Sequence, residues 1–213
     1  MKELKNQAEL NALHSRINPH FLYNSLNSIN NFVLQNDIEK ASDYITKFSR
    51  LIREILKNSS SLSISLEEDL GILGLYVKLE QMRMVGGFDY VVTIDDNIDL
   101  KEIKVPPLFM QPYVENAIWH GFSNNDGYKK INLSIYNEDD KIRCEIVDNG
   151  IGIDQSKYRN KNKGSSRKTF GLKVSEDRIK MLYENQNVYV ILEDISDQYG
   201  TGTKVTLKFP KVM

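Results

Sequence analysis

The hydrophobic pattern of this chain changes its period near residue 65, and this change separates two kinds of structure. Before it, apolar residues recur every three or four positions, as in amphipathic helices. Two stripes follow each other there: Leu22, Leu26, Ile29 and Val33, then Ala41, Ile45, Phe48, Ile52 and Ile55. Proline lacks a backbone donor, so Pro19 should kink or interrupt the first helix. Asn36-Asp37 predicts a turn and a helix cap between the two stripes.

After residue 65 helical and alternating patterns are interleaved. Ser65 and Glu68 have capping-box spacing, which predicts a helix over about 65–84. Further helices are predicted at about 108–120 and 172–184. Alternating apolar residues predict strands at 90–94, 131–136, 142–147, 188–192 and 204–209. The polar, basic run 155–170 is expected to be a loop. This order favours an α+β fold in which helices cover one face of a mixed sheet.

The two helical stripes before residue 58 are too broad for one hairpin to bury. A partner hairpin would cover them, so we expect a homodimer with a four-helix bundle. The expected division is a dimerisation and phosphotransfer segment, residues 1–60, followed by a catalytic domain, residues 61–213.

Charge and composition exclude several classes of protein. The 213 residues have a net charge of −1, without the basic field of a direct nucleic-acid binder. Cys144 is the sole cysteine, which excludes an intrachain disulfide and fits a reducing compartment. No apolar run approaches the roughly 18 residues of a membrane helix. We therefore expect a cytoplasmic protein. Because a helical pattern begins at once, we also expect it to be a piece of a longer one.

His20 is the histidine best placed for chemistry. At 100° per residue it lies about 150° from the first apolar stripe, on the polar face that also carries Asn24. A neutral imidazole keeps a nitrogen lone pair that can act as a nucleophile. An isolated exposed histidine is more often an ordinary surface residue, and we interpret His14 and His120 in that way.

A glycine-rich turn, Asp148-Asn149-Gly150-Ile151-Gly152, follows the strand predicted at 142–147. Glycine permits positive φ and close approach of the backbone to a ligand. Taken alone, the same letters could form a plain turn, because Asn-Gly is a common turn signal.

The run Ile17-Asn18-Pro19-His20-Phe21-Leu22-Tyr23-Asn24-Ser25-Leu26-Asn27 resembles the phosphoacceptor segment of LytS/YesM-type sensor histidine kinases. The resemblance implies that His20 accepts a phosphoryl group from ATP and passes it to a response-regulator aspartate. Asn24 matches the position that orients water for dephosphorylation of the regulator. Two departures are Arg16, where the family usually has glutamine, and Phe21, where many kinases have an acidic base.

Three further motifs resemble the boxes of the GHKL (Bergerat) ATP-binding fold, in the order that fold requires. They are 111–121 (QPYVENAIWHG), 170–173 (FGLK) and 200–203 (GTGT). Together with the glycine-rich turn at 148–152, they extend the resemblance over nearly the whole chain. The implied ligands are ATP and Mg²⁺.

Residue chemistry fits the roles that the resemblance implies. The Asp148 carboxylate can accept the adenine amine, and the Asn116 carbonyl oxygen suits Mg²⁺. Backbone groups near the phosphates would come from the following residues: Gly150, Gly152, Gly171, Leu172, Gly200, Gly202 and Thr203. Gly171 is expected just before a helix N-terminus that faces the phosphates. The 157–173 segment carries seven Lys or Arg and no acid, which suits a lid over a triphosphate or a solvated surface loop.

Two positions depart from the wider pattern of the fold. Trp119 stands where many kinases have a phosphate-binding lysine, and His120 or a lid cation could replace it. Pro112 stands where the ATPases of this fold have the glutamate that activates water. Glu115 is the nearest acid and could polarise water or His20.

Three classes of function remain. The leading one is an autophosphorylating histidine kinase, with a response regulator as partner, in some relatives carrying a LytTR output domain, and with a membrane-tethered parent. A hydrolytic GHKL ATPase is disfavoured by Pro112 and by the His20 segment. A degenerate, nucleotide-gated dimer scaffold is disfavoured by the intact Asn116, Asp148 and glycine boxes.

Overall fold

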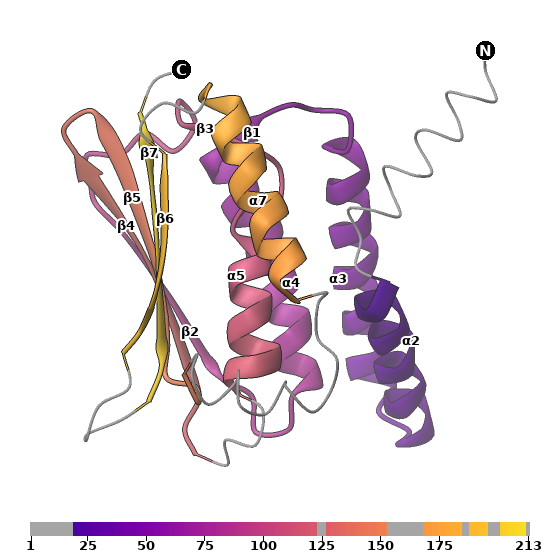
Figure 1. Ribbon diagram of the computed structural model, residues 1–213. Helices are drawn as coiled ribbons and strands as arrows, with labels where there is room; N and C mark the ends of the chain where they lie inside the picture. Colours follow the sequence, from indigo (N-terminus) through magenta and orange to yellow (C-terminus); the bar gives the residue numbers. More distant parts are fainter. Residues whose placement is uncertain (1–18, 123–126, 153–167, 185–187, 196–200, 212–213) are drawn as a thin grey trace.

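The computed structural model describes residues 19–122, 127–152, 168–184, 188–195 and 201–211. Its elements form three layers (Figure 1): a twisted sheet, then helices α4, α5 and α7 against one face of the sheet, then helices α3 and α2 on the outside. The α+β class predicted from the sequence is confirmed, with helices on one face of a mixed sheet. The division at residue 60 stays a prediction.

Helices α2 (Pro19–Leu34) and α3 (Ile38–Lys57) form an antiparallel hairpin. Asn36 has a positive φ of 57°, and the Asp37 side chain accepts a hydrogen bond from the Lys40 backbone N–H at 3.1 Å. The predicted turn and cap are therefore present. The described part of α2 begins at Pro19, so a kink before that residue lies outside the described residues.

The buried face of α2 differs from the predicted stripe. Phe21, Ser25 and Ser28 are buried, whereas Leu26 and Val33 are 58% and 52% exposed. The Ser25 hydroxyl accepts a hydrogen bond from the Tyr44 hydroxyl of α3 at 3.2 Å. The sequence analysis expected one hairpin to leave part of the apolar stripe uncovered, and Leu26 and Val33 belong to the exposed part. The buried serines have hydrogen-bond partners, which makes their burial possible.

Helix α4 (Leu66–Arg83) begins at the predicted capping box. The Glu68 N–H donates to the Ser65 hydroxyl at 3.2 Å, and the Ser65 N–H donates to the Glu68 carboxylate at 3.1 Å. Strands β1 (Ile64–Ser65) and β3 (Lys104–Val105), which the sequence analysis did not predict, pair antiparallel beside its start. These contacts anchor the helix that separates the α2–α3 hairpin from the sheet (Figure 1).

The main sheet has the strand order β2-β4-β5-β7-β6. The strands are β2 (Asp89–Ile94), β4 (Lys130–Glu138), β5 (Lys141–Asp148), β7 (Thr203–Pro210) and β6 (Tyr189–Asp194). The β2–β4 pair is parallel, and the other pairs are antiparallel. All five strands were predicted, with bounds that differ by no more than two residues.

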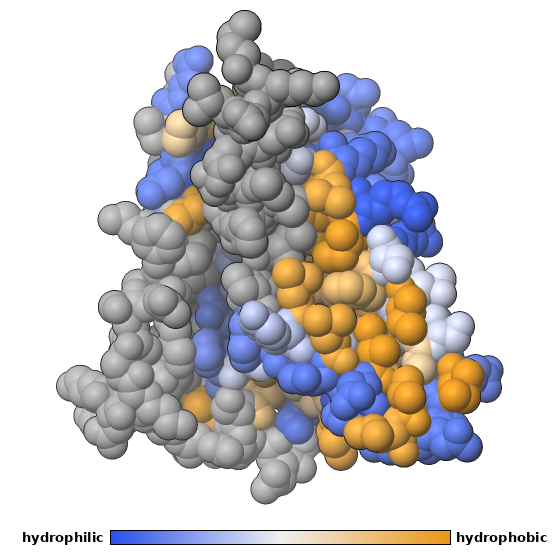
Figure 2. Space-filling view, turned by 90° about the vertical axis from the view of Figure 1, so that its right-hand side faces the viewer, coloured by the Kyte–Doolittle hydropathy of each residue, from blue (hydrophilic) through white to orange (hydrophobic). Residues whose placement is uncertain are grey.

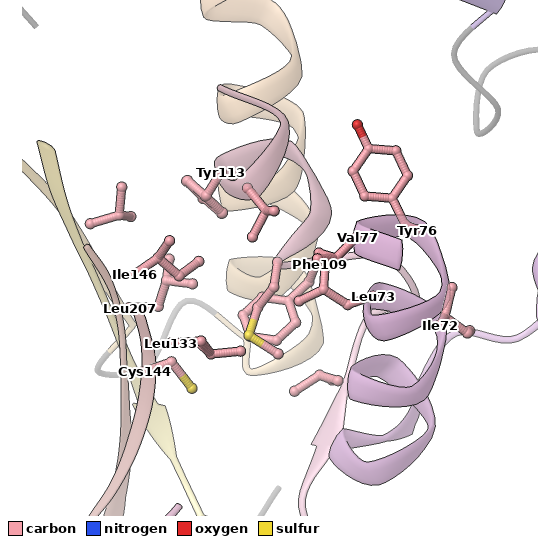
Figure 3. Packing of buried hydrophobic residues seen from close by; sticks show 14 of the residues in the cluster. Ile72, Leu73, Tyr76, Val77, Phe109, Tyr113, Leu133, Cys144, Ile146 and Leu207 are labelled. Carbon is pink, nitrogen blue, oxygen red and sulfur yellow. The ribbon is translucent and has the colours of Figure 1, made fainter. Parts of the chain in front are cut away.

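The core lies between the sheet and the inner helices. Figure 3 shows side chains of β4, β5 and β7 meeting those of α4 and of the segment before and within α5. Alternate residues of β5 are buried, and Cys144, in the middle of that strand, is fully buried. Because one face of the strand is buried, the register between β5 and β7 is well specified, and this register brings Asp148 opposite Thr203.

Two predicted helices have different bounds in the structure. The helix predicted at 108–120 is α5 (Gln111–Asn116) followed by a π-helical turn, η1 (Ala117–Gly121). It starts late because Leu108 has a left-handed φ of 61° and donates its N–H to the buried Asp69 carboxylate at 2.6 Å. Helix α7 (Lys168–Leu182) starts four residues earlier than predicted. The prediction that 168–170 belong to a loop was wrong, since a glycine inside a helix costs only about 1 kcal/mol.

Candidate functional site

Asp148 ends strand β5 and is 5% exposed. Its carboxylate accepts a hydrogen bond from the Gly150 N–H at 2.9 Å. Burial raises the pKa of Asp148 to about 6, although hydrogen bonds from the Gly150 and Thr203 backbones oppose the rise. A buried carboxyl at the end of the central strand is suited to recognise a hydrogen-bond donor of a ligand.

Three backbone segments meet around Asp148 because each has a glycine at the contact. A Cβ on Gly150 would lie 2.4 Å from the Gly121 Cα, and a Cβ on Gly202 would lie 2.2 Å from the Asp148 carbonyl oxygen. A side chain at either position would force the segments apart. The end of η1, the turn after β5 and the segment before β7 are therefore brought together at one place.

The turn after β5 is held by Asn149 and Gly152. The Asn149 side chain accepts from the Lys130 N–H and donates to the Tyr128 carbonyl, both at 2.7 Å. Gly152 has φ +75°, a conformation that favours glycine. The plain-turn interpretation of this motif explains Asn149, but it does not explain the buried Asp148.

Asn116 is the last residue of α5 and is half-buried, and its side chain makes no capping hydrogen bond. Within the described ranges, no three His, Cys, Asp or Glu side chains cluster as metal ligands. Mg²⁺ that is bound with a nucleotide is held largely by phosphates and water, so a single amide oxygen such as that of Asn116 can serve as its protein ligand. Glu115, beside Asn116, accepts a hydrogen bond from the Gln111 side chain at 2.8 Å.

His20 is exposed on α2, and its ring packs against Trp119 of η1 with the ring centroids 4.6 Å apart and the ring planes tilted by 55°. The Asn24 amide nitrogen lies 3.2 Å from His20 Nδ1 and 3.3 Å from Nε2. The two residues thus share one face of α2, as the helical spacing predicted. His120 follows Trp119 and is half-buried beside Gly121.

The structure describes some of the remaining predicted site residues and leaves others outside the described ranges. Gly171 lies in the first turn of α7 and Leu172 directly after it, so the prediction that the helix begins at Leu172 was wrong. Gly202 and Thr203 lie beside Asp148. Gly200 and the basic run up to residue 167 fall outside the described residues.

Two residues of the site were not singled out by sequence reasoning. Gly121 had a signal, since it closes the 111–121 motif and its Cβ would lie 3.0 Å from the Asp148 carboxylate. Arg83, at the end of α4, had none. Its guanidinium lies 4.1 Å from the Trp119 ring centre, a contact that only the tertiary structure creates.

Comparisons with known proteins identify the family of this chain. Residues 107–213 match the model of the histidine kinase-, DNA gyrase B-, and HSP90-like ATPases, and residues 8–88 match the histidine kinase model. The chain therefore belongs to this ATPase family, and its two segments together form the catalytic core of a LytS-type sensor histidine kinase. Membership in the family implies use of ATP.

The sensor protein LytS of Bacillus anthracis is 30% identical over 98% of this chain and 35% of its own length. The sensor histidine kinase/phosphatase LytS of Staphylococcus aureus is 34% identical over 73% of this chain and 26% of its own length. The chain thus spans about a third of the curated relatives it matches. Among solved structures, the catalytic domain of histidine kinase ThkA has a TM-score of 0.49 and 13% identity, over 71% of this chain and 97% of that one. None of the helices in the described residues is long and apolar enough to cross a bilayer.

Proposed function

We propose that this chain binds ATP at Asp148 and phosphorylates its own His20, as the core of a two-component sensor kinase. The observation that supports the proposal most is the position of η1. This single turn contacts His20 through Trp119 and contacts the Asp148 turn through Gly121. The nucleophile and the nucleotide site thus share one structural element.

In the proposed reaction a lone pair on the His20 imidazole attacks the γ-phosphorus of ATP. The N–P bond forms while the bond from phosphorus to the β,γ-bridging oxygen breaks, and ADP leaves. The other ring nitrogen gives up its proton, for which Glu115 is the proposed acceptor. Asp148 accepts the adenine amine, and the backbones around Gly150, Gly152 and Gly202 let the nucleotide approach closely.

Asn116 is proposed to hold Mg²⁺ through its amide oxygen, and the ion would offset phosphate charge. His120 and the start of α7, including Gly171 and Leu172, are proposed to lie beside the phosphates. N–H groups in the first helical turn lack intrahelical partners and favour anions. Gly200 and Thr203 complete the proposed glycine box.

A receiver domain of a response regulator, with or without a LytTR output, is the proposed acceptor of the phosphoryl group. The parent protein is proposed to be membrane-tethered, with this core on the cytoplasmic side. Asn24 is proposed to orient water during dephosphorylation of the regulator, and the Staphylococcus aureus relative carries the name kinase/phosphatase. An amide can hold water by hydrogen bonds without competing as a nucleophile. Asn24→Ala should then slow dephosphorylation of the phosphorylated regulator, measured as loss of its label.

The central test is transfer of label from γ-³²P ATP. The parent chain should gain acid-labile, base-stable label, as phosphohistidine does, and His20→Gln should gain none while still binding ATP. His14→Gln is the matched control and should label like the parent. Equal labelling of His20→Gln and its parent would show that His20 is not the acceptor.

A homodimer is proposed through α2 and α3. These helices leave large apolar side chains exposed: Tyr23, Leu26, Val33, Leu34, Ile38 and Ile45. Figure 2 shows apolar side chains gathered on the side of the molecule where α2 and α3 lie. Monomers rarely expose a large contiguous apolar patch unless it is an interaction site.

A further inference from the structure

Trp119 is held on several sides by residues of the catalytic domain. Its indole N–H donates to the Tyr76 hydroxyl at 3.3 Å, and the Arg83 guanidinium lies 4.1 Å from its ring centre. Arg83 is in turn ion-paired with Glu80, which is 1% exposed. The indole therefore presents a fixed aromatic surface, and the ring that lies on it belongs to His20.

The position of Trp119 in the sequence makes this contact informative. The residue three places after Asn116 is the one that departs from the lysine of many kinases. A lysine has no aromatic ring against which an imidazole can pack, whereas an indole offers the largest aromatic surface among the side chains. The residue that stands in place of the lysine, Trp119, is thus the one that contacts His20, the proposed phosphoacceptor.

The ring nitrogens of His20 also lie close to Asn24. A neutral imidazole has one N–H and one nitrogen with a lone pair. The Asn24 amide nitrogen is within 3.3 Å of both ring nitrogens. A position so nearly equidistant from the two nitrogens lies off the in-plane axis of either lone pair. Asn24 therefore contacts the ring without occupying the lone pair that an N–P bond requires.

We propose that Trp119 is a positioning residue that holds His20 in a resting place on the catalytic domain. Phosphorylation then requires the imidazole to leave Trp119. The inference rests on the proposed function, because it concerns the same phosphoacceptor. It adds a restraint on the nucleophile that lies outside the nucleotide site itself.

The contact can be tested without any kinase activity, because Trp119 is the only tryptophan of the chain. An imidazole packed against the indole shields part of the indole from water. Its removal in His20→Gln should therefore shift the emission of Trp119 to longer wavelength, and His14→Gln should leave the emission unchanged. The same emission maximum in His20→Gln and its parent would overturn the contact.

The resting role predicts a gain of activity. Trp119→Ala should raise the kcat of autophosphorylation roughly two- to tenfold, the range expected for loss of one aromatic contact. The KM for ATP should stay unchanged. Trp119→Phe keeps an aromatic ring and should behave like the parent. A variant damaged in its fold would lose activity, so a gain cannot come from misfolding.

The outcomes separate this inference from the proposed function. No label on the parent chain would refute the kinase reaction itself. A labelled parent with a lower kcat in a Trp119→Ala variant that melts normally would refute the resting role alone. If Trp119→Ala does not fold, Trp119→Leu, which keeps an apolar side chain without an aromatic ring, takes its place in the same comparison of kcat.

Discussion

At the scale of single residues, the buried Asp148 carboxyl predicts how nucleotide binding depends on pH. Its pKa is raised to about 6, so the group is neutral below that pH and anionic above it. An anionic acceptor binds the adenine amine better than a neutral acid, so ATP affinity should fall as the pH drops through about 6. Calorimetric titration of ATP between pH 5 and 8 measures this.

Asp148→Asn provides the control for that titration. It should weaken ATP binding by about 1–3 kcal/mol at pH 7.5, the cost of an imperfect buried hydrogen-bond partner. It should also lose the part of the pH dependence that belongs to Asp148, while the part from the ATP phosphates remains. Parallel pH profiles for the two proteins would contradict a role of Asp148 in nucleotide recognition.

Two glycine substitutions should have opposite effects. Gly150→Ala should abolish nucleotide binding and lower the melting temperature, because its Cβ would overlap the Gly121 backbone at 2.4 Å. Gly71 lies on the exposed side of α4 with no atom within 4 Å of a new Cβ. Gly71→Ala should therefore stabilise the chain by about 0.5–1 kcal/mol, since alanine favours a helix. Thermal melting of the two variants tests both the expected loss of stability in Gly150→Ala and the expected gain in Gly71→Ala.

At the scale of elements, α4 depends on its capping box. Ser65→Ala removes the acceptor of the Glu68 N–H and should lower the free energy of unfolding by about 0.5–2 kcal/mol. Ser65→Asp keeps an acceptor and should recover most of the loss. Urea unfolding measures the difference, and an unchanged midpoint for Ser65→Ala would show that the cap contributes nothing to stability.

The α2–α3 hairpin shows why helical faces are harder to assign than helices. Leu26 and Val33 have the spacing of a buried stripe, yet the single chain buries Phe21, Ser25 and Ser28 instead. Both faces of α2 carry apolar residues, so periodicity alone does not decide which of them meets α3. Tyr44 settles the choice by donating a hydrogen bond to Ser25, a contact between positions 19 residues apart.

At the scale of the whole molecule, the exposed face of α2 and α3 predicts self-association. Light scattering of the parent should give a mass of about twice that of the 24.6 kDa chain. The double variant Leu26→Asp, Val33→Asp should be a folded monomer. A dimer of this variant would have to bury the new carboxylates in its interface, which costs free energy. Val85→Asp changes a valine that is 95% exposed after α4 and should leave the dimer intact. A monomeric parent at micromolar concentration would contradict the four-helix bundle.

The sequence by itself determined the features that depend on local chemistry. Strand alternation predicted all five strands of the sheet, and the spacing of Ser65 and Glu68 predicted the start of α4. Neighbouring residues carry these signals, so no tertiary contact is needed to interpret them. The motifs around His20, Asn116 and Asp148 likewise indicated the family from residue type and order.

Only the tertiary structure decided which of these residues touch. The late start of α5 depends on Asp69, a residue 39 positions from Leu108 that accepts its N–H. The contacts of Trp119 with His20 and Arg83 join α2, α4 and η1, which are far apart in the chain. Such contacts follow from how helices pack against one sheet, and packing depends on the shapes of many side chains together rather than on a local pattern.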